Sequence, residues 1–231
     1  MTARRSYSSY NDGCASAHAL DLIGERWTLI VVRELLLGPK RFAELQRDVA
    51  GIGPAVLSTR LRELEARGIA TRRTLPAPAR VDVYELTEWG RRLEAVNAAL
   101  SAWAVGSPDL PWEADMSPDT LVLAMRAHAR PEGRADHDAE KEGVRVSLHL
   151  RDSRREGAEA VTYSALVSAE RSVVEKVPEP PAPAAEVHAT TAEWKAWILG
   201  GRPVTELAGL RITGSEQAVA RLIAATRFER P

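Results

Sequence analysis

The first half of the chain is organised around residues 51–68, GIGPAVLSTRLRELEARG. Leu57, Leu61 and Leu64 recur at helical spacing, which predicts a helix with one buried stripe. Gly53-Pro54 suits the beginning of this helix, and Gly68 suits its C-terminal cap. At about 100° per residue, the opposite face is small and polar with one long cation, and it carries Ala55, Ser58, Thr59 and Arg62. A face of this kind fits a DNA major groove.

A β-hairpin is expected directly after this helix. Residues 69–75 and 81–86 are rich in β-branched residues and flank the short loop 76–80, PAPAR. Between positions 40 and 80 there are nine Lys or Arg and four Asp or Glu, whereas the whole chain has a net charge of −1. Nucleic-acid affinity comes mainly from neutralised phosphates, so this concentration of positive charge points to DNA.

The helix within residues 51–68 is called the recognition helix below. Three helices are expected before it, over 15–22, 27–37 and 41–49. The third is joined to the recognition helix by a short Gly-containing turn, which gives a helix-turn-helix, and the hairpin makes it winged. The predicted DNA contacts come from the helix before the turn, the recognition helix and the wing. They are Lys40, Arg41, Ala55, Ser58, Thr59, Arg62, Arg72, Arg73 and Arg80.

A single helix is expected after the wing, over 87–105. Its apolar residues recur at helical spacing and are Leu93, Val96, Leu100, Trp103 and Ala104. Such a stripe needs a partner, and two-fold symmetric binding to paired half-sites is common among helix-turn-helix modules. The sequence therefore predicts a homodimer, with packing on the chain's own domain as the alternative.

Five stretches in this half resemble the HxlR-type winged-helix transcriptional regulators. They are Cys14, residues 19–29 (ALDLIGERWTL), 38–45 (GPKRFAEL), 57–64 (LSTRLREL) and 80–90 (RVDVYELTEWG). The resemblance covers about residues 14–104. It implies a DNA-binding dimer that pairs through its N-terminal helix and the helix after the wing, and that acts in most cases as a repressor.

Cys14 is the only cysteine in the sequence, which excludes an intramolecular disulfide. In some relatives of the resembled family a cysteine near the N-terminus senses oxidants or electrophiles. Cys14 precedes a helix, which favours the thiolate, but its nearest charge in sequence is that of Asp12, which does not. Two interpretations remain, a small half-buried residue at the dimer seam and a redox sensor.

A second domain is expected after residue 107. Residues 1–107 hold 15 basic and 12 acidic residues, whereas residues 108–231 hold 16 and 20. Residues 106–118, with three prolines, are typical of a linker. The predicted domains are a winged helix-turn-helix over 1–107 and an α+β domain over 108–231.

The second domain alternates helices and strands. Helices are expected over 120–128, 190–200 and 216–226, and strands over 144–150, 161–167, 171–177, 185–189 and 210–213. Thr190 and Glu193 form a capping box, and Gly200-Gly201 ends that helix. The pattern predicts a mostly antiparallel sheet packed with helices.

From about residue 117 to residue 228 the order of elements resembles the sterol-carrier-protein-2-like fold. The stretches that carry this resemblance are residues 190–194 (TTAEW), 200–203 (GGRP) and 209–214 (GLRITG). The resemblance implies an apolar tunnel and a small hydrophobic ligand, with Trp194, Trp197 and Ile198 as its lining. The alternative is that the two tryptophans are core aromatics.

No catalytic or metal-binding motif is recognised. His18, His128, His137, His149 and His188 are scattered without a metal-ligand spacing, and Asp136-His-Asp138 reads as a solvated loop. Phosphate-binding loops and nucleophile elbows are missing from the sequence, so neither an enzyme nor a cofactor is expected. No apolar run is long enough for a membrane span, and the N-terminus lacks the apolar region of a signal peptide, so a cytoplasmic protein is expected.

Three functions are compatible with these patterns. The first is a DNA-binding regulator whose activity is modulated by a small apolar ligand in the second domain. The second is a regulator that responds to oxidants or electrophiles through Cys14. The third is a small-molecule carrier or enzyme tethered to DNA. The sequence favours the first.

Overall fold

The predicted recognition helix is α4, Pro54–Ala66, in the computed structural model, which describes residues 9–130, 143–198 and 201–227. The described chain divides into two compact units, residues 1–97 and 98–231. The division falls within a helix, whereas the linker in the sequence predicted it at residue 107. The domain limits 1–107 and 108–231 therefore stay a prediction, and each unit is described by itself.

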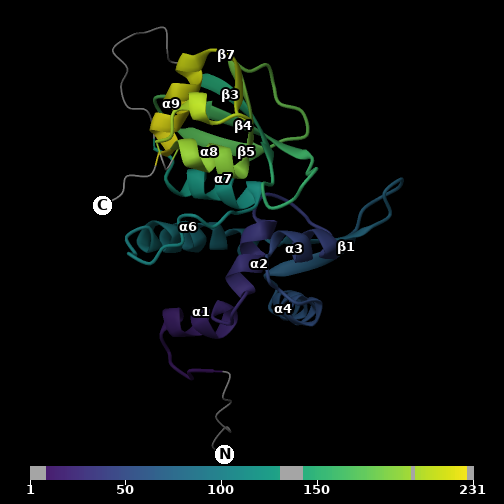
Figure 1. Ribbon diagram of the computed structural model, residues 1–231. Coiled ribbons are helices and arrows are strands. Elements are labelled where there is room, and N and C mark those ends of the chain that lie inside the picture. The colour runs from purple at the N-terminus through teal and green to yellow at the C-terminus, as the bar shows by residue number, and fades with distance from the viewer. Residues whose placement is uncertain (1–8, 131–142, 199–200, 228–231) are drawn as a thin grey trace, which may run out of the picture. The chain divides into compact units, whose positions relative to one another are not determined.

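The first unit is a winged helix-turn-helix. Leu57, Leu61 and Leu64 are buried as the spacing predicted, and they pack in the core with side chains from α2 and α3. In Figure 1 the hairpin extends away from the helices of this unit. The elements, in order, are α1 (Ala15–Ile23), α2 (Thr28–Leu35), α3 (Phe42–Asp48), α4, β1 (Ala70–Thr74), β2 (Asp82–Leu86), α5 (Glu88–Arg91) and the beginning of α6 (Leu93–Ala104).

The helix predicted over 87–105 is wrong in one respect, because the chain forms two helices there, α5 and α6. The Thr87 hydroxyl accepts a hydrogen bond from the Gly90 N–H at 3.0 Å and donates one to the Gly68 carbonyl at 2.8 Å. A Cβ on Gly90 would lie 2.0 Å from the Ile69 carbonyl oxygen, so only glycine permits this close approach. These contacts hold α5 against the end of α4, and the helix is interrupted before Leu93.

The second unit is α+β. Its elements after α6 are α7 (Pro118–Ala127), β3 (Val144–Arg151), β4 (Ala160–Val167), β5 (Ser172–Lys176), β6 (Ala185–Thr190), α8 (Thr191–Ile198), a short 3-10 helix η2 (Val204–Glu206), β7 (Arg211–Gly214) and α9 (Glu216–Thr226). The strand and helix positions agree with the predicted ones to within a few residues. The Thr190–Glu193 capping box is confirmed, since Thr190 N–H donates to the Glu193 carboxylate at 3.0 Å. Gly200, Asp136, His137 and Asp138 lie outside the described residues.

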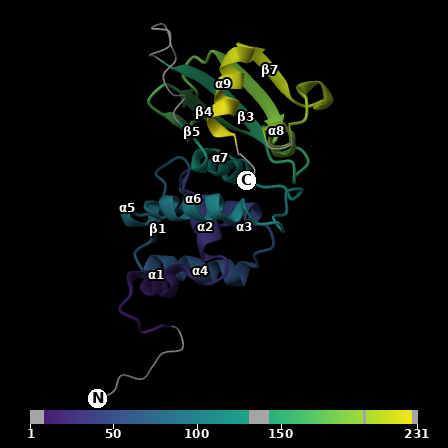
Figure 2. The ribbon, with the colours of Figure 1, turned by 90° about the vertical axis from the view of Figure 1, so that its left-hand side faces the viewer.

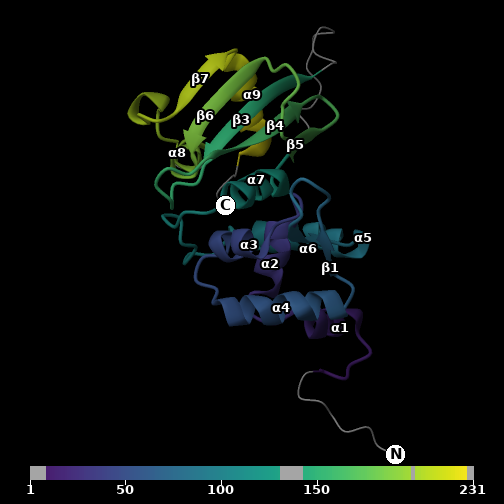
Figure 3. The same cartoon turned by 90° about the vertical axis from the view of Figure 1, so that its right-hand side faces the viewer.

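Among the described residues, five strands form one sheet in the order β5-β4-β3-β6-β7. All neighbours pair antiparallel except β3 and β6, which are parallel. Helix α9 packs across β3, β4, β5 and β6, and α7 packs on β5 and α8. In Figure 2 α9 lies in front of the sheet, and in Figure 3 it lies behind the strands.

Strand alternation gives this sheet one apolar and one polar face. On the side of α9, the core contains Val146, Leu148 and Leu150 of β3 together with Ala185, Val187 and Ala189 of β6. The alternate residues of the same strands point to the other face. That face is polar, and it includes Ser147, His149, Glu186 and His188.

Candidate nucleic-acid interface

The outward face of α4 has the composition that a groove-reading helix needs. Ala55 and Arg62 are exposed, and Ser58 and Thr59 are half-buried. The Arg62 guanidinium donates to the Ser58 carbonyl and to the Thr59 hydroxyl, both at 3.3 Å. These contacts lay the guanidinium along the helix surface, so it can extend toward a base edge without losing a buried partner.

The wing carries its arginines on an exposed surface. Arg72, Arg73 and Arg80 are all exposed. Arg72 pairs with Asp82, and Arg73 pairs with Glu85 at 2.9 Å. Hydrogen bonds from Thr74 and Arg72 hold the pKa of Asp82 below its usual value, so this carboxylate stays ionised near neutral pH. A phosphate that contacts Arg72 or Arg73 must therefore compete with a carboxylate.

The neighbours Lys40 and Arg41 lie in opposite environments. Arg41 is exposed at the N-cap of α3. Lys40 is buried, and its Nζ lies 2.8 Å from a Glu34 carboxylate oxygen and 3.0 Å from one of Asp48. Its backbone also pairs with Tyr84 of β2. The expectation that Lys40 contacts DNA is therefore corrected: its ammonium neutralises two carboxylates inside the domain and is not available to a phosphate.

Apolar side chains are exposed on α1, on α5 and along α6, the helix in which the two units divide. No residue of α6 is buried, and Trp103 is 80% exposed. Within the first unit, a groove of about 210 Å³ is lined mainly by apolar side chains, including Leu22, Ile23, Leu93 and Val96. The further large apolar residues exposed on these helices are Leu20, Trp89 and Leu100. Of the stripe predicted from spacing, Val96, Leu100 and Trp103 are exposed, whereas Leu93 packs partly against the core of the first unit.

Comparison with known proteins connects this geometry to a family. A model described as HxlR-like helix-turn-helix matches residues 22–108. The HTH-type transcriptional regulator YodB of Bacillus subtilis is 41% identical over 87 residues, which are 37% of this chain and 77% of that protein. The chain belongs to the HxlR-like helix-turn-helix family. It is thus a DNA-binding transcriptional regulator.

Other relatives and solved structures also match part of this chain. An uncharacterized HTH-type transcriptional regulator of Mycobacterium tuberculosis, MT3179, is 40% identical over 117 residues, which are 51% of this chain and 69% of that protein. The solved structure of the reduced form of YodB is 36% identical over 42% of this chain and 95% of that one, with a TM-score of 0.38. The oxidized form of the redox regulator HypR is 35% identical over 42% and 100%, with a TM-score of 0.39.

The thiol of Cys14 in this HxlR-like chain is exposed and stands at the N-cap of α1. Its Sγ lies 3.0 Å from the Ser16 hydroxyl. That hydrogen bond, with those of the Ala17 and Ser16 backbone N–H groups, lowers the pKa of the Cys14 thiol. The Asp12 carboxylate accepts from the Cys14 backbone N–H at 2.9 Å. The balance of these contacts favours the thiolate, which the charge of Asp12 alone did not suggest.

In the second unit, a groove of about 640 Å³ lies between α8, η2, β7 and α9. Its mainly apolar lining includes Trp197, Val204, Ile212 and Ile223, with Glu216 and Arg227 as charged members. Of the three predicted ligand contacts, only Trp197 lines this groove. Trp194 and Ile198 are buried, and the Trp194 indole N–H donates to Met125 Sδ at 3.2 Å. For Trp194 the core interpretation holds.

Two histidines that looked unrelated in the sequence lie side by side. His149 of β3 and His188 of β6 occupy the same register of the parallel pair, and their rings stack with centroids 4.4 Å apart. Burial and the neighbouring His188 lower the pKa of His149, whereas Glu186 acts in the opposite direction. Both residues lie within strands that the sequence predicted, over 144–150 and 185–189. The pairing of β3 with β6, which joins segments distant along the chain, was not predicted.

No helix in the described part of the chain is both long and apolar enough to cross a membrane.

Proposed function

We propose that this chain is a sequence-specific repressor that binds DNA as a homodimer. Helix α4 enters the major groove, where Ala55, Ser58, Thr59 and Arg62 read base edges. Arg41 and the wing arginines Arg72, Arg73 and Arg80 contact the phosphate backbone and set the register. The observation that carries the proposal is the two-sided character of α4, with a leucine stripe in the core and a small polar face with one arginine outside.

We infer that the homodimer pairs through the exposed apolar side chains of α6 and of α1 and α5. An exposed stripe that includes Trp103 at 80% and Leu100 at 45% is unusual for a free surface and typical of an interface. A two-fold pairing also supplies two recognition helices for two half-sites about one DNA turn apart.

The test begins with selection of binding sites from random duplex DNA by the full-length protein. We expect an inverted repeat, and sedimentation should show two chains per bound duplex. Leu100→Glu places a charge in the proposed interface and should give a folded monomer with weaker operator binding. A single, non-repeated site bound by one chain would contradict the homodimer. Binding that does not change with sequence would contradict base readout.

We further propose that residues 108–231 form an SCP2-like domain whose α8–α9 groove takes a small apolar ligand that alters operator affinity. The mainly apolar lining and the volume of about 640 Å³ support a ligand of this class. Palmitate serves as the probe in calorimetry with the full-length protein, followed by operator binding at saturating palmitate. Ala220→Trp fills the groove and should abolish binding. Thr213→Trp, on the opposite face of β7, is the matched control and should not.

Coupling between groove and operator requires that palmitate favour one DNA-binding geometry over the other, and differences of about 1 to 3 kcal/mol are typical. If palmitate binds the parent and Ala220→Trp equally well, the groove is not its site. If palmitate binds the groove and operator affinity stays the same, modulation by such ligands is wrong, while the DNA-binding proposal stands.

A second candidate response rests on Cys14. Its thiol is exposed and its pKa is lowered, two properties of thiols that react with oxidants and electrophiles. We expect diamide or a quinone to change operator affinity of the parent and to leave Cys14→Ser unaffected. An equal response of both proteins would exclude this thiol as the sensor.

A further inference from the structure

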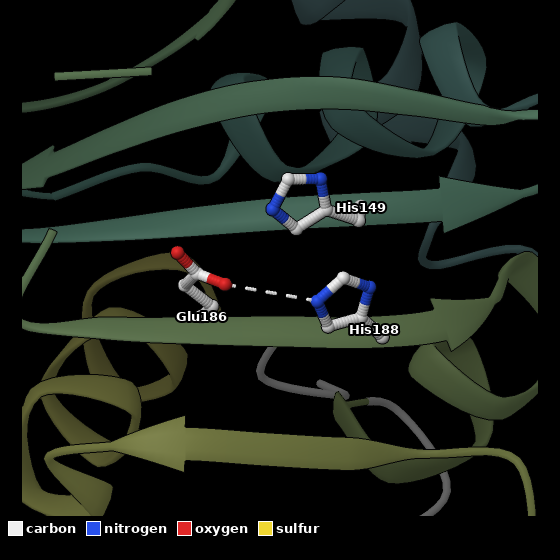
Figure 4. A group of neighbouring side chains, drawn as sticks. All are labelled: His149, Glu186 and His188. Carbon is white, nitrogen blue, oxygen red and sulfur yellow. Dashed lines mark ion pairs between the residues drawn. The ribbon is translucent and has the colours of Figure 1, made fainter. Parts of the chain in front are cut away.

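The polar face of the second unit's sheet carries a cluster of three metal-ligating side chains. His149 comes from β3, and Glu186 and His188 come from β6. Because β3 and β6 are parallel and His149 pairs in register with His188, the two rings project from adjacent strands on the same side. Figure 4 shows Glu186 beside them, two residues before His188 on the same strand.

The distances within the cluster are short. One potential ligand atom from each of the three side chains lies within 4.8 Å of the others. His188 Nε2 is 3.8 Å from a Glu186 carboxylate oxygen. His149 Nδ1 lies 3.1 Å from the Thr162 hydroxyl of the neighbouring strand β4. That contact orients the ring and leaves Nε2 of His149 for another partner, an arrangement typical of histidine ligands.

Ser147 gives a second, independent indication. It pairs in register with Glu186 and stands two residues before His149, so its side chain is on the same face of the sheet. Ser147 is 0% exposed, and its hydroxyl has no hydrogen-bond partner among the described residues. A buried hydroxyl without a partner is unfavourable unless an unseen water or ion satisfies it. The unsatisfied oxygen therefore lies where something polar is expected to bind.

We propose that His149, Glu186 and His188 form a binding site for one divalent transition-metal ion, with the remaining coordination positions open to water or to an external ligand. The site lies wholly within the second unit and does not depend on the proposed DNA contacts. A water on the ion would also provide a partner for the nearby Ser147 hydroxyl.

The donor set decides the class of metal. Two imidazole nitrogens and one carboxylate oxygen suit Zn²⁺ and its neighbours Co²⁺, Ni²⁺ and Cu²⁺, whereas Ca²⁺ and Mg²⁺ prefer all-oxygen sites. Two ligand atoms at about 2.1 Å from a tetrahedral ion are about 3.4 Å apart. The side chains must therefore move together by about an ångström, and the two stacked rings must turn so that their nitrogen lone pairs converge on the ion. Rotation about their χ angles supplies this, because all three residues are only half-buried.

The test uses full-length, untagged protein that carries Cys14→Ser, so that the thiol cannot bind metal. Calorimetric titration with ZnCl₂ should give one ion per chain. His188→Ala and Glu186→Gln should each raise the Kd at least tenfold, because each removes a ligand. His18→Ala removes a histidine on α1, far from the cluster in sequence, and should leave the Kd unchanged. Titration with CoCl₂ should give visible absorption bands that Glu186→Gln alters.

Two outcomes would overturn the proposal. One is the lack of saturable Zn²⁺ binding by the parent. The other is equal Zn²⁺ affinity in the parent and in the His149→Ala/His188→Ala double variant. Circular dichroism and thermal unfolding check the fold of each variant. Glu186→Gln is nearly isosteric and keeps the test decisive if an alanine variant unfolds.

Discussion

Lys40 and Arg41 are adjacent basic residues, yet the structure places one inside the first unit and the other on its surface. The Lys40 ammonium is buried between the carboxylates of Glu34 and Asp48, whereas Arg41 is exposed at the beginning of α3. Arg62 and the wing arginines are exposed, as Arg41 is. We therefore expect a buried positive charge near the helix-turn-helix to contribute to stability and an exposed one to contribute to DNA affinity.

The largest expected effect tests the buried side of this comparison. Lys40→Ala removes the cation shared by Glu34 and Asp48, which keep Arg33 and Arg47 as partners. Because these arginines compensate part of the lost charge, the cost should lie at or below the lower end of the about 3 to 5 kcal/mol typical of a broken buried ion pair. Urea unfolding at fixed protein concentration should show this loss in the free energy of unfolding. Arg41→Ala is the matched neighbour and should stay within about 0.5 kcal/mol of the parent, as exposed substitutions do. A Lys40→Ala protein as stable as the parent would contradict the stabilising role assigned to the buried Lys40 ammonium.

Arg62→Ala tests the exposed side on the recognition helix. Loss of a base contact should weaken operator binding by about 1 to 3 kcal/mol and relax specificity, with the free energy of unfolding unchanged. Fluorescence anisotropy with operator and non-operator duplexes measures both effects. Arg60 provides the contrast on the same helix. Its side chain is 14% exposed and lies 2.9 Å from Glu63, so Arg60→Ala should act through stability.

If Arg62→Ala binds the operator as tightly and as selectively as the parent, α4 is rotated differently in the groove from the orientation proposed.

The wing should show a smaller effect per residue and no sequence preference. Replacing Arg72, Arg73 and Arg80 with alanine should weaken binding to all duplexes. It should also reduce the slope of log affinity against log salt by up to about 3, since each lost phosphate contact releases about one counterion fewer. Because Arg72 and Arg73 already pair with Asp82 and Glu85, we expect the slope to fall by well under about 3. Equal slopes for the two proteins would exclude the wing from the interface.

The smallest effect concerns the exposed thiol of Cys14. Because hydrogen bonds from Ser16 and Ala17 lower its pKa, the reactive thiolate persists at a lower pH than in a free cysteine. The rate of alkylation by iodoacetamide should therefore reach half of its maximum below the pH found for glutathione. Ser16→Ala removes the hydroxyl that hydrogen-bonds to the Cys14 sulfur, so the midpoint pH of alkylation should rise. A midpoint at or above that of glutathione would contradict the assignment.

The elements of the first unit were predictable because their signals are local. The leucine spacing of α4, the proline at its beginning and Gly68 at its end depend only on neighbours in sequence, and the structure confirms them. The interruption between α5 and α6 was missed, since it depends on the contact between Gly90 and Ile69, which no helical period reveals. Lys40 was misassigned for a related reason, because its two carboxylate partners are brought to it by the fold.

In the second unit, too, the features that the sequence did not predict depend on contacts between residues distant along the chain. The strands predicted over 144–150 and 185–189 include His149 and His188, and the structure confirms both strands. Their pairing follows from the order of strands in the sheet, which sequence periods do not contain. The groove near Trp197 is likewise made by elements that come together only in the folded chain, and of the residues predicted to line it Trp194 and Ile198 belong to the core.

The parallel pairing of β3 with β6 also has a consequence during synthesis of the chain. β4 and β5 can pair with β3 and with each other as soon as they emerge, but the other edge of β3 must wait for β6. Until then a strand that will be central has an open edge, with Leu148 and Leu150 on its apolar face. Open apolar edges recruit other chains. A chain that ends between β5 and β6 should therefore aggregate, whatever the stability of its helices.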